Sequence, residues 1–150
     1  MGGDRVTAPA DLHGHWRLLS WTGTDATGRE VRHGGDRPRG DLIYLPSGRM
    51  AVQIQHDSRV RFGSADFTAG STEQRAEAWA TFNAYCGTWE LCGEGVVVHH
   101  VELATHPDHP GIDKERRFTL AGDELTLETQ PVATGDGEAT SILRWRRDDS

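Results

Sequence analysis

The segment at residues 95–104, with the sequence GVVVHHVELA, constrains the fold of this chain more than any other. Its run of valines around two adjacent histidines predicts a β-strand. Successive side chains of a strand point to opposite faces of the sheet. One face would carry Val97, His99, Val101 and Leu103, and the other Val98, His100 and Glu102. Either face could be the interior one, and each places a titratable side chain among apolar neighbours, as in a pocket with polar anchors.

A second strand is expected directly after a proline-rich loop, at residues 114–120 with the sequence KERRFTL. On that strand Arg116, Phe118 and Leu120 share one face. A cation therefore lies beside an apolar wall. We expect the two strands to be antiparallel neighbours.

Turn signals separate further strands along most of the chain. The predicted strands are residues 15–24, 29–33, 41–45, 49–55, 88–92, 96–104, 115–120, 125–129 and 141–146. A spacing of about ten residues between turns is typical of antiparallel sandwiches and barrels. Strands and helices do not alternate, which argues against a parallel sheet. Polar residues recur on the apolar faces, which suits the lumen of a closed barrel better than a packed sandwich.

One helix is expected between these strands. Ser71 and Gln74 have the spacing of a capping box, and Ala76, Trp79, Phe82 and Tyr85 follow at helical spacing. Residues 57–85 are long enough to cover one mouth of the barrel and to exclude water from it. The expected fold is therefore all-β, an antiparallel barrel of eight to ten strands with one helix covering an opening.

The size and charge of the chain limit its organisation and partners. Its 150 residues suit a single domain, expected at residues 12–148 after a flexible N-terminus at residues 1–11. A net charge of −7 argues against nucleic acid or an anionic membrane as the main partner. No apolar run suits a membrane span or a secretory leader. Cys86 and Cys92 lie too far apart on one strand to form a disulfide, which favours a cytoplasmic location. The oligomeric state stays open, a homodimer included.

Several segments carry a family resemblance. They are GHWRLLSW at residues 14–21, LIYLPSGRM at 42–50, the end of the predicted helix, VHHVE at 98–102 and RRFTL at 116–120. The chain resembles the bacterial lipocalin-like domain proteins, which are calycin-type barrels, over residues 12–147. The resemblance implies an apolar cavity for a small organic molecule. It also implies that Trp16 plugs the closed end of the barrel, stacked by Arg144 or Arg146.

Three residues are the candidates for chemistry. A buried His99 could move a proton near neutral pH, although a satisfied core histidine is an equal alternative. Arg116 could stabilise negative charge on a ligand, or form an ion pair with Glu90 or Glu102. Tyr44 could orient a carbonyl, or simply pack. The residues expected to shape the binding site are Trp89, Met50, Val52, Ile54, Val101, Phe118 and Glu102.

Metal and cofactor chemistry find no support in the sequence. The cluster His99, His100, Glu102, His106, Asp108 and His109 is divided between two strand faces and a loop, and no zinc-binding spacing is present. Dinucleotide, P-loop and serine-hydrolase motifs are also missing. Any reaction is expected to need no cofactor.

The functional expectation is a barrel that binds a small hydrophobic, oxygenated metabolite. It would promote a cofactor-independent cyclisation or isomerisation of a polyketide-type or terpenoid-type substrate in natural-product biosynthesis. The alternative is a non-catalytic cytoplasmic carrier for an apolar small molecule. A third reading is an interaction module whose core is filled.

Overall fold

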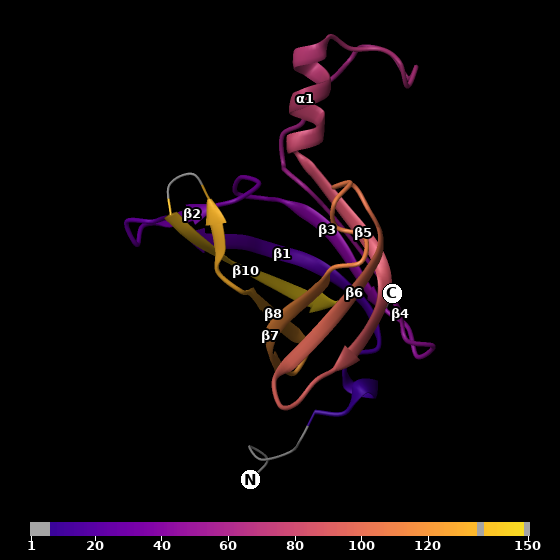
Figure 1. Cartoon of the computed structure of the whole chain (residues 1–150), viewed down its shortest axis with the longest axis vertical. Coiled ribbons are helices and arrows are strands. Elements are labelled where there is room, and N and C mark those ends of the chain that lie inside the picture. Colours follow the sequence, from indigo (N-terminus) through magenta and orange to yellow (C-terminus); the bar gives the residue numbers. More distant parts are fainter. Residues whose placement is uncertain (1–6, 135–136, 149–150) are drawn as a thin grey trace.

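The chain forms a closed antiparallel barrel, seen in a computed structural model that describes residues 7–134 and 137–148 (Figure 1). The strands are β1 (Gly14–Thr24), β2 (Glu30–Arg32), β3 (Arg39–Tyr44), β4 (Arg49–Gln55), β5 (Phe82–Leu91), β6 (Val96–Ala104), β7 (Asp113–Ala121), β8 (Glu124–Thr129), β9 (Val132–Thr134) and β10 (Gly137–Arg147). Eight of them make the barrel, in the order β1-β3-β4-β5-β6-β7-β8-β10, and β10 pairs with β1 to close it. Short strands β2 and β9 flank β1 and β10. The predicted all-β barrel is confirmed.

Alternating polarity in the sequence decides which side chains fill the barrel. On β4, Met50, Val52 and Ile54 are buried while the residues between them are exposed. On β6, Val97, His99 and Val101 are buried, so the face that carries His99 is the interior one. Val98 on the opposite face is also buried, at 6% exposure.

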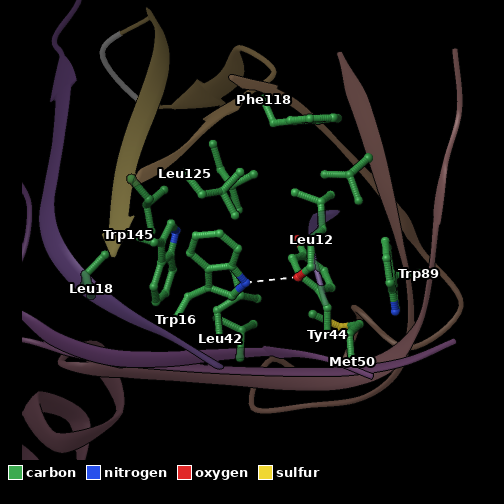
Figure 2. Close-up of a cluster of buried hydrophobic side chains, with 14 of the residues drawn as sticks. Leu12, Trp16, Leu18, Leu42, Tyr44, Met50, Trp89, Phe118, Leu125 and Trp145 are labelled. Atoms are coloured by element: carbon green, nitrogen blue, oxygen red, sulfur yellow. Dashed lines mark hydrogen bonds between the residues drawn. The ribbon is translucent and has the colours of Figure 1, made fainter. Parts of the chain in front are cut away.

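One end of the barrel is filled by large side chains (Figure 2). A short 3-10 helix (Pro9–Asp11) precedes Leu12, and both Leu12 and Trp16 are fully buried. The Trp16 indole N–H donates to the Leu12 carbonyl at 3.0 Å. Trp145, Tyr44 and Trp89 surround this pair in the core. Part of the flexible terminus expected at residues 1–11 lies outside the described residues.

The cation over Trp16 is Arg147, so the prediction of Arg144 or Arg146 was wrong. The guanidinium carbon of Arg147 lies 4.2 Å from the Trp16 ring centroid. Arg147 is directly opposite Trp16 in the β1–β10 register. Because Trp145 points inward, Arg147 shares its face, whereas Arg144 and Arg146 point outward.

A β-bulge reverses the facing of the last residues of β6. Cys86 pairs with Leu103 but Gly87 pairs with Val101, so Glu102 is the extra residue. Leu103 is consequently 68% exposed rather than aligned with His99, which corrects the row expected from simple alternation. A Cβ at Gly87 would lie 1.9 Å from the His100 carbonyl oxygen, so the bulge requires glycine there.

The helix α1 (Thr72–Ala80) is shorter than expected. Its capping box is confirmed, because Ser71 and Gln74 bond each other's backbone N–H at 3.2 and 2.8 Å. Phe82 and Tyr85, however, belong to β5, where they pair with β4. Sheet pairing overrides the local helical periodicity. Figure 1 shows α1 projecting from the barrel wall beside the start of β5, and none of its residues is buried. No helix within the described residues is long and apolar enough to cross a membrane.

Candidate functional site

A cavity of about 100 Å³ lies inside the barrel, away from the end that Leu12 and Trp16 fill. All eight barrel strands contribute to its wall. Its apolar lining consists of Trp21, Leu42, Val52, Ile54, Leu127, Leu143 and Trp145. Its polar lining consists of Asn83, Tyr85, His99, Lys114, Arg116, Thr129 and Ser141. The cavity therefore combines a mostly aliphatic wall with hydrogen-bond donors and two cations.

His99 is held between two tyrosines. Its Nε2 lies 2.6 Å from the Tyr44 hydroxyl on β3, and its Nδ1 lies 2.7 Å from the Tyr85 hydroxyl on β5. His99 is 1% exposed, Tyr44 is fully buried and Tyr85 is 9% exposed. Both ring nitrogens thus have partners, and the imidazole orientation is fixed by groups from two other strands.

The hydrogen-bonded side chains of Tyr44, His99 and Tyr85 are all neutral at physiological pH. Burial lowers the pKa of His99 to about 3, and the nearby charges of Arg116 and Lys114 act in the same direction. Burial also raises the pKa of Tyr44 and Tyr85 above the ordinary value for a phenol. A neutral imidazole has one N–H donor and one acceptor nitrogen.

The burial of Tyr44 decides which nitrogen of His99 carries the proton. Among the described residues, the only hydrogen-bond partner of the Tyr44 hydroxyl is His99. If Nε2 carried the proton, the Tyr44 O–H would be a buried donor with no acceptor, which is costly. Tyr44 therefore donates to Nε2, and the Nδ1–H of His99 donates to the Tyr85 oxygen. The Tyr85 O–H is then left to donate into the cavity that Tyr85 lines.

Two cationic side chains, those of Lys114 and Arg116, lie beside the Tyr85 hydroxyl. Lys114 and Arg116 are alternate residues of β7, and both line the cavity. The Lys114 Nζ lies 4.7 Å from the centroid of the Tyr85 ring. Among the side chains that the structure describes, those of residues 7–131 and 140–148, no carboxylate forms an ion pair with Lys114 or Arg116. Burial lowers the pKa of Lys114 to about 8, and the neighbouring Arg116 charge contributes to the shift.

The family model for the lipocalin-like domain matches residues 13–148, which is nearly the whole barrel. The chain belongs to the lipocalin-like domain family. A similar curated protein is the 4'-hydroxy-3'-methoxypropiophenone carrier protein of Aspergillus oryzae. The two chains are 27% identical over 106 residues, which cover 65% of this chain and 96% of the relative.

The lipocalin-like barrel brings some of the expected site residues together. His99, Arg116, Val52 and Ile54 line the cavity, and Tyr44 lies one hydrogen bond behind it. Arg116 donates to the Glu115 carbonyl at 3.1 Å rather than to a carboxylate.

Other expected site residues lie elsewhere in the lipocalin-like barrel. Met50, Val101, Phe118 and Trp89 are buried in the core but do not line the cavity. Trp89 packs on Tyr44, with ring centroids 4.6 Å apart, and donates to the Leu45 carbonyl. Glu102, expected at the ligand, instead lies on the outer surface and pairs with Arg49 at 2.8 Å, because it shares the strand face of His100, opposite to that of His99.

Five polar residues of the cavity were not among the expected site residues: Asn83, Tyr85, Lys114, Thr129 and Ser141. Lys114 shares strand parity with Arg116 and is the single lysine of the chain, so parity alone could have identified it. The residues before Tyr85 have helical spacing, so Tyr85 was assigned to the predicted helix instead of to a strand. Its role becomes visible only through the pairing of β5 with β4 and β6.

Proposed function

We propose that this lipocalin-like barrel is a binding and carrier protein for a small aromatic molecule that bears a carbonyl or phenolic oxygen. The observation that carries the proposal is the Tyr85 O–H, which the His99–Tyr44 pair leaves available to an acceptor in the cavity. An apolar wall with a few polar groups at fixed positions is the usual composition of a small-molecule site.

The dimensions of the cavity limit the ligand to about one ring and require side chains at its wall to move for that ring to bind. An apolar protein cavity of about 150 Å³ accommodates benzene, and the cavity here measures about 100 Å³. The side chains of Lys114 and Arg116 are partly exposed, so they can shift to admit a substituted ring. A large polycyclic ligand would require rearrangement of the aliphatic wall.

The Aspergillus oryzae relative supports the same ligand class. The compound in its name has one aromatic ring, a ketone, a phenol and a methoxy group. In our proposal the ring lies against the aliphatic residues and the ketone accepts from Tyr85, close to the two cations Arg116 and Lys114.

Catalysis of a cofactor-independent cyclisation or isomerisation is the second candidate function. The presence of Arg116 at the cavity favours it, because a guanidinium there would stabilise an enolate as it forms. In this proposal His99 positions Tyr85 instead of moving a proton itself, since both of its nitrogens are engaged and its pKa is about 3.

Titration with 4'-hydroxy-3'-methoxypropiophenone tests the proposed binding. Trp21 and Trp145 line the cavity, so tryptophan fluorescence should change saturably with one equivalent of ligand. Val52→Phe places extra volume in the cavity and should weaken binding at least about tenfold. Ala51→Phe is the matched control, because Ala51 is the exposed neighbour on β4 and its variant should bind normally.

The same samples separate the two functions. Recovery of unchanged ligand supports the carrier, and a new product that Arg116→Gln no longer forms supports the enzyme. Absence of saturable binding by the wild-type protein, or equal binding by the Val52→Phe and wild-type proteins, would contradict the proposal.

A further inference from the structure

Lys114 stands out among the cavity residues because its amine lies in an unusual environment. It is the single lysine of the chain. Its position on β7 is directly opposite His99 on β6. Its Nζ lies over the Tyr85 ring, and Lys114 lines the same cavity as His99 and Arg116.

This environment disfavours the charged form of the amine for two reasons. Part of the side chain is buried against the aromatic ring, and a second cation, Arg116, lies two residues along the same strand. No carboxylate within the described part of the chain pairs with Lys114 to offset these effects. The pKa of about 8 that results leaves roughly a tenth of the amine neutral at pH 7. Lysines that form covalent adducts with carbonyl compounds are activated by these same means, burial and a neighbouring cation.

We propose that Lys114 forms a reversible imine with a carbonyl ligand bound in the barrel. The inference rests on the proposed function, and it narrows the ligand class to aldehydes and ketones. It also gives the barrel a covalent mode of holding or activating its ligand.

The step balances with water as its one by-product. The Nζ lone pair forms a bond to the carbonyl carbon, and the carbonyl π electrons move to oxygen, which gains a proton. The carbinolamine that results expels this oxygen as water, and the C=N bond forms. Both hydrogens of the neutral amine end on the departing water. No oxidant or reductant is needed.

The Tyr85 hydroxyl is positioned to assist imine formation at Lys114. Tyr85 lies under the Lys114 amine, and its O–H is free because His99 Nδ1–H donates to its oxygen at 2.7 Å. A phenol that donates to the carbonyl oxygen makes the carbon more electrophilic. Tyr85 thus serves the step as a hydrogen-bond donor, and His99 and Tyr44 serve it as positioning residues.

Reductive trapping tests the inference. The full chain is incubated at pH 7 with 4-hydroxybenzaldehyde and sodium cyanoborohydride, which reduces an imine to a stable secondary amine. Intact-mass measurement counts adducts, and peptide mapping separates Lys114 from the α-amino terminus, whose ordinary pKa is also near 8. Trapping at Lys114 in the folded protein should be at least about tenfold faster than in the urea-unfolded chain.

Lys114→Arg is the informative variant, because it keeps the cation and removes the nucleophile. It should bind 4-hydroxybenzaldehyde in the fluorescence titration but form no adduct inside the barrel. Lys114→Gln serves as a second variant with the same expected loss of the adduct.

The outcomes distinguish this inference from the function on which it rests. Wild-type protein that binds the aldehyde without trapping at Lys114, or that traps it no faster than the unfolded chain, overturns the imine and leaves the carrier intact. Wild-type protein that binds neither the aldehyde nor the propiophenone overturns both.

Discussion

Arg147 holds Trp16 in place at the filled end of the barrel. Its guanidinium lies 4.2 Å from the indole centroid, and its two terminal nitrogens donate to the carbonyls of His13 and Asp11 at 2.6 and 2.7 Å. Trp16 in turn donates to the Leu12 carbonyl. One side chain from the last strand therefore fixes the segment that precedes the first strand.

Replacing Arg147 with Met should destabilise the protein by about 2–4 kcal/mol, because a cation–π contact and two charge-assisted hydrogen bonds are lost. The urea midpoint measures the effect. Arg146→Met is the matched control, since Arg146 is exposed and lies 3.9 Å from the carboxylate of Glu124. The control should lose less than about 0.5 kcal/mol. Equal losses in the two variants would mean that the Trp16 contact contributes nothing specific.

The two tyrosines that hold His99 should have separable roles. Tyr44→Phe leaves the buried Nε2 of His99 without a donor and should cost about 1–3 kcal/mol of stability. Tyr85→Phe removes the donor that faces the cavity and should weaken binding of a carbonyl ligand about tenfold, with a smaller loss of stability. Nitrogen NMR should show the proton of His99 on Nδ1. A proton on Nε2 would contradict the assigned hydrogen-bond directions.

Protonation of His99 should destabilise the fold. Its pKa is near 6.5 in the unfolded chain and about 3 in the barrel. Above pH 6.5 both states are neutral, so the full stability is present. As the pH falls below 6.5, the unfolded chain binds a proton that the folded protein does not, and stability declines until about pH 3.

In the window between pH 6.5 and 5 most carboxylates are still ionised. His33 and His109, whose pKa values burial also lowers, contribute equally to the wild-type protein and to His99→Gln. The urea midpoint of the wild-type protein should fall more steeply in that window than the midpoint of His99→Gln. If that variant does not fold, a proton NMR titration of the wild-type protein replaces it. Titration of the His99 imidazole near pH 6.5 would refute the prediction.

The contribution of the adjacent His100 to stability should show the opposite pH dependence. It lies on the outer surface, where it bonds Asp113 at 2.6 Å and Glu90 at 2.8 Å. The hydrogen bonds to Asp113 and then to Glu90 raise its pKa above the ordinary value. Its contribution is therefore complete below about pH 6.5 and is lost as the pH rises through the raised pKa.

The stability difference between the wild-type protein and His100→Asn should accordingly shrink from pH 6 to pH 9. It should also shrink in high salt, because the three groups are solvent-exposed and screened. A difference that grows with pH would show that the histidine is not the charged partner of these carboxylates.

Alternation of polar and apolar residues accounts for most of what the sequence predicted correctly. The strand at residues 96–104 was predicted with the bounds that β6 has, whereas the sequence left open which of its faces is the interior one. The wall residues Val52 and Ile54 were identified in the same way. These features depend on the two-residue period of a strand, which is visible locally.

The features that the sequence did not predict depend on pairing between distant segments. The bulge opposite Gly87 turns Leu103 away from the interior, and its only local trace is a glycine. Tyr85 has helical spacing, yet it joins β5 because two neighbouring strands bury it. Arg147 lies over Trp16 because of the register between β1 and β10, which turn signals do not specify.

The pairing of β1 with β10 has a consequence for biosynthesis. Because the strands nearest the two ends of the barrel sequence meet at this seam, a ribosome-bound chain that still lacks β10 can form at most an open sheet. The edges of β1 and β8 would then be unpaired and available to other chains. Closure must await emergence of residues 137–147 from the ribosome, so the two open edges persist until the last barrel strand is available and expose the nascent sheet to aggregation beforehand.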